Sequence, residues 1–288
     1  MDEFPSFERD TRAPNPLPPR GSCDGQIHVF GDVARYPVRA GRAYDPPRAT
    51  FEDARQVHRA LGIDRVVIAQ ATPYGTDHRL LLDVLAGQKD YRGVAIIDET
   101  VSDKELLRLH EAGVRGARFN FAKFLNYAPS PEGFLRSIER IQELGWFAKV
   151  HGTGEELLEH ERILRPLKLP VLIDHLGGLD FSRDLKQPGC VFILDLLKNH
   201  GWWMMLSNGD RWSKQGPPWD DAIPFAQAFV EAAPDRTVWG TDWPHVRYRR
   251  KMPNDADLLE LLYRAVPDPA QRQRILVDNP ARLFGFGR

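Results

Sequence analysis

Four segments of the chain end an apolar run with a side chain that can carry out acid–base chemistry. The most informative is residues 238–245, in which Asp242 stands where an apolar run gives way to a Pro-containing loop. His28, His151 and His175 end three other apolar runs in the same way. A carboxylate can accept a proton, and an imidazole can donate one or polarise a carbonyl group. Four such ends, spread over most of the chain, indicate a converging site if the fold gathers them.

A parallel α/β barrel gathers all strand ends at one face, where such folds carry their active sites. Continuous apolar runs, typical of strands covered on both faces, alternate here with helical stretches. The predicted strands are residues 23–30, 65–70, 93–97, 114–121, 147–151, 171–175, 202–206 and 237–239. The predicted helices are residues 51–61, 77–86, 103–112, 131–144, 155–164, 192–200, 222–233 and 256–265. The sequence therefore predicts an α/β protein with a (β/α)8 TIM barrel of distorted form.

Residues 1–20 are predicted to form a Pro-rich extended arm, because proline disfavours both helices and central strands. Residues 21–288 form one predicted barrel domain, which ends in two helices separated at Pro280. An open doubly wound sheet is the alternative, but no Gly-rich phosphate motif follows the first strand.

The composition limits the possible partners. The 39 Lys and Arg residues nearly balance the 40 Asp and Glu residues, so the formal net charge is −1. This argues against nucleic acids and membrane surfaces, which attract basic proteins. Two cysteines cannot build a disulfide framework, and we recognise neither a secretory signal nor a membrane-spanning run. We expect a cytoplasmic protein that acts on a small molecule. A homo-oligomer is compatible with the sequence, which does not specify the assembly.

Five motifs together resemble the amidohydrolase-2 family of the amidohydrolase superfamily. They are Gln-Ile-His at 26–28, Gly-Ala-Arg-Phe-Asn-Phe at 116–121, Ile-Asp-His-Leu-Gly at 173–177, Trp-Gly-Thr-Asp-Trp-Pro-His at 239–245 and Asn-Pro-Ala-Arg-Leu-Phe-Gly at 279–285. The resemblance is greatest to the lactone-processing members, the 2-pyrone-4,6-dicarboxylate lactonases and D-galactarolactone isomerases. It implies an enzyme that acts on a small anionic lactone.

The resemblance also implies a role for each strand-end residue. Asp242 matches a general base that takes a proton from the water attacking a lactone carbonyl. His28 and His175 match the groups that bind and polarise that carbonyl. The predicted substrate-binding residues are Gln26, Tyr44, Thr72, Arg118, His151 and Arg211. Two of these are arginines at carboxylate-binding positions, and a guanidinium fork fits a planar carboxylate well.

The chain departs from the superfamily pattern at two places. Gln26 replaces the first histidine of a His-x-His metal pair, and a neutral amide oxygen is a poor zinc ligand beside imidazole. We therefore predict no cofactor, with one divalent ion, Zn or Mn, as the alternative. The candidate ligands of that ion are His28, His151, His175 and Asp242. Lys123 stands near where a second carboxylate-binding arginine is expected, which puts 2-pyrone-4,6-dicarboxylate itself in doubt as the substrate.

Some charged residues are given no role. Arg247, Arg249, Arg250 and Lys251 form a short basic run after the Asp242 loop, which is typical of a solvated surface.

We draw three hypotheses from these residues. The first is a lactonase of the ester-hydrolase type, with Asp242 activating water and with His28 and His175 on the carbonyl. The second is a lactone isomerase that uses the same base. The third is a barrel that binds a ligand without catalysis, since a fold alone does not establish activity.

Overall fold

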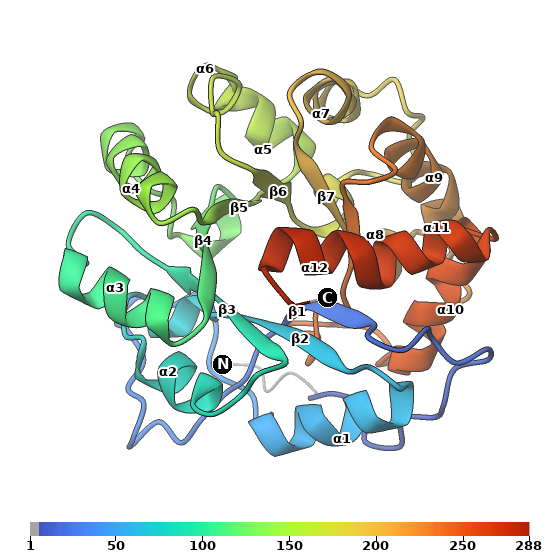
Figure 1. Cartoon of the computed structure of the whole chain (residues 1–288). Coiled ribbons are helices and arrows are strands. Elements are labelled where there is room, and N and C mark those ends of the chain that lie inside the picture. The colour runs from blue at the N-terminus through green and yellow to red at the C-terminus, as the bar shows by residue number, and fades with distance from the viewer. Residues whose placement is uncertain (1–5, 288) are drawn as a thin grey trace.

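In the computed structural model, which describes residues 6–287, eight parallel strands follow one another around a single sheet in chain order. The strands are β1 (Cys23–Ile27), β2 (Arg65–Ala69), β3 (Tyr91–Ile96), β4 (Val114–Asn120), β5 (Phe147–His151), β6 (Val171–Ile173), β7 (Trp203–Leu206) and β8 (Thr237–Trp239). Helices surround the sheet on its outer side (Figure 1). The predicted TIM barrel is confirmed, and all eight predicted strands are present.

The helices that follow the strands also match the predicted positions. They are α1 (Phe51–Leu61), α2 (Arg79–Leu85), α3 (Asp103–Glu111), α4 (Pro131–Glu143), α5 (Gly154–Glu159), α6 (Glu161–Leu164), α7 (Pro188–Asn199), α9 (Ile223–Ala232) and α10 (Asp255–Ala265). Short turns η1 (Thr72–Tyr74), η2 (Lys123–Leu125), η3 (His175–Gly178), η4 (Asp220–Ala222) and α8 (Gly209–Trp212) occupy the loops after the strands. The helix predicted at 155–164 is divided at His160, whose backbone leaves the helical region.

The closing helices differ from the prediction of a break at Pro280. α11 (Pro269–Gln273), the π-turn η5 (Arg274–Asp278) and α12 (Asn279–Phe284) follow one another without an intervening loop. Pro280 lies in the first turn of α12. Proline has no N–H to donate and its ring clashes with the carbonyl four residues before it, and the wider π-turn accommodates both effects.

The barrel closes where the end of β8 meets β1. Ile27 pairs with Trp243 in a parallel bridge, and the Asp242 amide donates to the Gln26 carbonyl at 3.0 Å. The fully buried Asp24 carboxylate accepts the amide of Thr241 at 3.0 Å and its hydroxyl at 2.6 Å. These contacts fix the segment that carries Asp242 against the strand that leads to His28.

The barrel interior changes from apolar to charged along the strands. On β5, Phe147 packs against Phe284 of α12, with ring centroids 5.5 Å apart, while Lys149 forms a buried ion pair one layer higher. His151 follows at the end of the same strand. Side chains alternate in a strand, so these three share its inner face. α12 thus lies across the end of the barrel at which the strands begin (Figure 1), and the other end is left for a site.

The predicted arm contains neither helix nor strand over residues 6–20, and residues 1–5 lie outside the described part of the chain. Phe7 packs on Trp243 with ring centroids 4.7 Å apart. Arg12 pairs with Glu260 of α10 at 2.6 Å. The arm therefore covers the segment that closes the barrel.

We predict that Asp24→Ala lowers the free energy of unfolding by about 4 kcal/mol, because the Gln26 and Thr241 donors lose their acceptor in a dry interior. Urea unfolding followed by circular dichroism measures the loss. The exposed Glu139→Ala variant is the control and should change stability by less than about 0.5 kcal/mol. A loss below about 1 kcal/mol in Asp24→Ala would show that the hydrogen bonds of Asp24 are not needed for stability.

Candidate active site

A cavity of about 270 Å³ opens at the end of the barrel where the strands terminate. It is lined by His28, Tyr44, Thr72, Arg118, Phe124, Leu125, His151, His175, Asn208, Arg211, Trp212, Asp242, Val246, Arg247 and Arg249. All the predicted site residues except Gln26 are among them. Gln26 is fully buried and contacts Asp242 and His175 from below the cavity surface.

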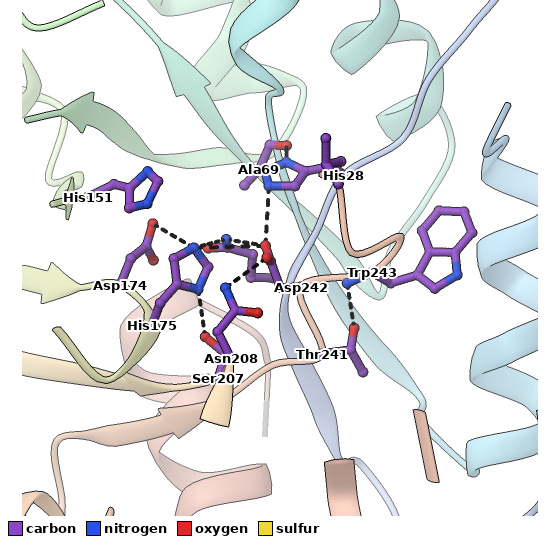
Figure 2. A network of polar contacts seen from close by, with 12 residues as sticks. His28, Ala69, His151, Asp174, His175, Ser207, Asn208, Thr241, Asp242 and Trp243 are labelled. Carbon is purple, nitrogen blue, oxygen red and sulfur yellow. Dashed lines mark hydrogen bonds and ion pairs between the residues drawn. The ribbon is translucent and has the colours of Figure 1, made fainter. Parts of the chain in front are cut away.

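The Asp242 carboxylate is held by two amide side chains. Gln26 Nε2 donates to Oδ1 at 2.9 Å, and Asn208 Nδ2 donates to Oδ2 at 3.0 Å. His28 Nε2 lies 3.4 Å from Oδ1. Figure 2 shows that His28 and Asn208 both point toward this carboxylate. Asp242 has a left-handed backbone with φ of 62°, an uncommon conformation for a residue with a side chain, and such conformations cluster at functional sites.

The surroundings keep Asp242 ionised. Burial alone would raise its pKa, but His175, His28 and Arg211 outweigh this effect and hold the pKa well below its ordinary value. Arg211 Nη2 lies 4.0 Å from Oδ2. The site therefore presents a carboxylate at neutral pH, which can accept a proton.

His28 is oriented by the backbone of the neighbouring strand. Its Nδ1 lies 2.7 Å from the carbonyl oxygen of Ala69 (Figure 2). Because a carbonyl oxygen can only accept a hydrogen bond, Nδ1 is protonated and is the hydrogen-bond donor. The neutral ring then has its lone pair on Nε2, which faces Asp242 and Arg118. His28 can donate a hydrogen bond from Nε2 only when it is protonated to the imidazolium.

His175 has a different set of contacts. Its Nδ1 lies 2.9 Å from the hydroxyl of Ser207, and its Nε2 lies 3.2 Å from the Gln26 amide nitrogen. If Gln26 donates one hydrogen to Asp242 and the other to His175, His175 Nε2 is the acceptor. Burial lowers the pKa of His175 to about 4, against the opposing charges of Asp242 and Asp174. The ring is therefore neutral at pH 7.

A buried charged layer lies below the cavity. Lys149 Nζ contacts Asp174 Oδ1 at 3.0 Å, and Arg118 Nη2 contacts Asp174 Oδ2 at 3.3 Å. Burial would raise the pKa of Asp174, but Lys149, His175 and Arg118 lower it to about 2. Arg118 also donates to His151 Nδ1 at 3.1 Å. The pKa of His151 lies well below its ordinary value, first because of burial and then because of Arg118.

The remaining predicted residues also line the cavity. Thr72 donates its hydroxyl toward the Tyr44 hydroxyl at 3.5 Å, and burial raises the pKa of Tyr44 to about 12. Arg211 donates from Nη2 to the carbonyl of Val246 at 3.0 Å. These groups offer hydrogen bonds and positive charge to a small polar ligand.

This geometry can be compared with known proteins. The family model described as amidohydrolase matches residues 23–286. The chain belongs to the amidohydrolase family. A 4-sulfomuconolactone hydrolase of Rhizobium radiobacter is 38% identical, over 93% of this chain and 91% of that protein. A 2-pyrone-4,6-dicarboxylate hydrolase of Comamonas testosteroni is 35% identical, over 92% of this chain and 90% of that protein.

Further relatives extend the comparison. A D-galactarolactone isomerase of Agrobacterium fabrum is 33% identical, over 94% of this chain and 94% of that protein. A solved apo structure from Agrobacterium tumefaciens is 32% identical, with a TM-score of 0.85 over 95% of this chain and 99% of that one. The amidohydrolase family thus includes both lactone hydrolases and a lactone isomerase among proteins similar to this chain.

Amidohydrolases often bind metal, and a solved amidohydrolase of Burkholderia multivorans with the same fold carries zinc. In this amidohydrolase, an N–H donor lies within 3.4 Å of one side-chain atom of each predicted metal ligand. Arg118 approaches His28 Nε2 at 3.4 Å and His151 Nδ1 at 3.1 Å. Gln26 contacts His175 Nε2 and Asp242 Oδ1. Within residues 6–287, no group of three or more His, Cys, Asp or Glu side chains is arranged to hold a metal ion.

Three features of the site differ from the sequence-based assignment. Arg247 and Arg249, which were interpreted as solvated surface, line the cavity because the loop after β8 folds back over it. Lys123 instead points outward, with a side chain that is 66% exposed and lies 2.7 Å from Glu159. Asn208 was not predicted as a site residue. It follows the end of β7 as Asp242 follows the end of β8, and this position after a strand could have identified it.

No helix among the described residues combines the length and apolar composition needed to cross a membrane.

We predict that His175 makes stability depend on pH between about 6.5 and about 4. In this range an unfolded histidine takes up a proton while the folded site excludes it, so the free energy of unfolding falls as the pH falls. The contribution is on the order of 3 kcal/mol. Urea unfolding from pH 7 to pH 4.5 should therefore give a shallower pH dependence for His175→Asn than for the wild type.

The control for this measurement is His200→Asn, because His200 lies on the exposed surface. It should keep the wild-type pH dependence. Equal slopes for the wild type and His175→Asn would contradict a buried neutral His175.

Proposed function

We propose that this amidohydrolase hydrolyses the ester bond of a small carboxylated lactone. The observation that carries the proposal is an ionised carboxylate, Asp242, in a cavity that is otherwise lined by arginines, histidines and neutral groups. Such a cavity attracts an anion and provides one base. The relatives that are named as lactone hydrolases support the same substrate class.

In the proposed reaction, Asp242 accepts a proton from the water that attacks the lactone carbonyl. Gln26 and Asn208 each donate to one carboxylate oxygen, which leaves further lone pairs for water. The oxygens are thereby fixed in direction, and an oriented base needs little rearrangement during the reaction. The low pKa of Asp242 keeps the base available over the whole neutral range.

We assign carbonyl polarisation to His28 and His175. The Nδ1 of His28 is paired with Ala69, so Nε2, which lies 3.4 Å from Asp242 Oδ1, is the ring atom left for the carbonyl oxygen. His175 can donate only in the tautomer with hydrogen on Nε2, and its contact with Gln26 favours the other tautomer. A hydrogen-bond donor directed at the developing oxyanion stabilises the transition state more than the ground state.

The carboxylate of the lactone is proposed to bind Arg118 and Arg211. Arg118 is held by Asp174 below the cavity, so its position is set before a ligand arrives. Tyr44, Thr72 and His151 complete the proposed contacts at the cavity wall. Preorganised partners reduce the entropic cost of binding.

We further propose that the reaction needs no metal ion. The N–H donors of Arg118 and Gln26 at the histidine and carboxylate atoms support this assignment. In addition, Gln26 contributes no imidazole where the superfamily has a metal ligand.

Lactone isomerisation is the second candidate, favoured by Gln26 and by the isomerase relative. There Asp242 would move a proton within the substrate rather than take one from water. Proton NMR of the product separates the two reactions, because isomerisation keeps a lactone ring and hydrolysis opens it.

We predict that Asp242→Asn lowers kcat for lactone opening by about 10³-fold, because the amide cannot accept the proton of water. Ring opening of a panel of carboxylated lactones, followed by absorbance, measures the rate. Asp90→Asn, at an exposed position, is the matched control and should keep full activity. Retention of more than about a tenth of the rate in Asp242→Asn would exclude Asp242 as the base.

We also predict that freshly purified protein contains well under one equivalent of zinc or manganese and keeps its activity after treatment with a strong chelator. Elemental analysis and rates before and after chelation measure both quantities. Stoichiometric metal together with chelator-sensitive turnover would overturn the metal-independent mechanism and assign His28, His151, His175 and Asp242 as ligands.

A further inference from the structure

Positive side chains predominate among the charged groups that line the cavity. Four arginines line it, together with a single carboxylate, Asp242. Arg118 is compensated from below by Asp174 at 3.3 Å, and Arg211 is drawn to Asp242 at 4.0 Å. Arg247 makes no ion pair of this kind among the described residues. Since the proposed first carboxylate binds Arg118 and Arg211, Arg247 is left for a second anionic group on the ligand.

Arg247 is positioned to receive that group. Its guanidinium lies over the ring of Phe124, 5.1 Å from the centroid, and Phe124 in turn packs edge-on against His151 at 6.0 Å. Its Nη1 is buried without a hydrogen-bond partner in the described part of the chain. A buried donor without an acceptor costs free energy, and an anion bound in the cavity would recover it.

The backbone keeps Arg247 at a set distance from the proposed base. Asp242, His245 and Arg247 all have positive φ values, of 62°, 58° and 62°. The His245 amide donates to the Asp242 carbonyl at 2.9 Å, and Arg211 donates to the Val246 carbonyl at 3.0 Å. Residues other than glycine persist in this region only where their surroundings determine the conformation. One tightly bonded loop thus carries both the base and Arg247.

The segment after β4 does not supply this charge, because Lys123 faces Glu159 on the outside. Arg247 reaches the same segment from the opposite side of the cavity, through Phe124. We propose that Arg247 binds a second oxyanion group of the substrate, a carboxylate or a sulfonate, and that the enzyme therefore prefers dianionic lactones. This proposal rests on the proposed lactonase function and specifies its substrate.

The test compares the wild type with Arg247→Ala, Arg247→Lys and Lys251→Ala, the last being an exposed cation of the same loop. The substrates are 2-pyrone-6-carboxylate, 2-pyrone-4,6-dicarboxylate and 4-sulfomuconolactone. Arg247→Ala should lower kcat/KM about tenfold or more for the dianions, mainly through KM, and about twofold at most for the monoanion. Arg247→Lys should restore part of the loss, because lysine keeps the charge without the fork. Lys251→Ala should match the wild type.

A loss for only one dianion identifies the carboxylate or the sulfonate as the group that Arg247 binds, and supports the proposal. Equal losses for monoanion and dianions, or no loss, overturn it. Binding of pyridine-2,4-dicarboxylate and pyridine-2-carboxylate, measured by calorimetry, tests the same subsite without any lactone. If the wild type opens no lactone but prefers the diacid through Arg247, only the proposed reaction fails. If it has no such preference, or if Arg247→Ala leaves the preference unchanged, the subsite fails.

Discussion

The active site depends on the hydrogen bonds that close the barrel between its last and first strands. Asp24 accepts the amide and the hydroxyl of Thr241, and the next amide, of Asp242, donates to the carbonyl of Gln26. A carboxylate in a dry interior accepts strong hydrogen bonds and is costly to leave unpaired. The contacts thus fix the two segments that carry the proposed base, its amide partner and His28. Gly240 permits the close approach of the two segments, because a Cβ at this position would lie 2.8 Å from the backbone nitrogen of Gln26.

The electrostatics of the site, which lies above the hydrogen bonds of Asp24, follow from the placement of a few charges. Lys149 and Arg118 share the buried Asp174, so that layer contributes little net field apart from one guanidinium directed at the cavity. His175 remains neutral because burial outweighs its acidic neighbours. Asp242 is then the single carboxylate among the described residues that line the cavity. Of the arginines proposed to bind an anion, Arg211 lies 4.0 Å from this carboxylate, and Arg118 is paired with Asp174 instead.

Gln26 illustrates how one substitution can redirect a shared site. An imidazole at this position would offer a lone pair to a cation, whereas the amide nitrogen of Gln26 offers hydrogens to Asp242 and His175. In the proposed metal-independent mechanism the histidines and the aspartate are retained, and Gln26 supplies hydrogen bonds where a histidine would supply a ligand atom.

The sequence by itself determined the barrel and most of the cavity wall, because strand periodicity is local and every strand ends at the same face. Asp242, His28 and His175 could be located from their strand ends alone. The sequence could not decide the partners of those groups. Asn208 donates a hydrogen bond to Asp242, Lys123 points outward and Arg247 lines the cavity. All three positions depend on loop paths that are set by contacts between distant segments. Hydrogen-bond direction and burial, which decide protonation and metal fit, exist only once the chain has packed.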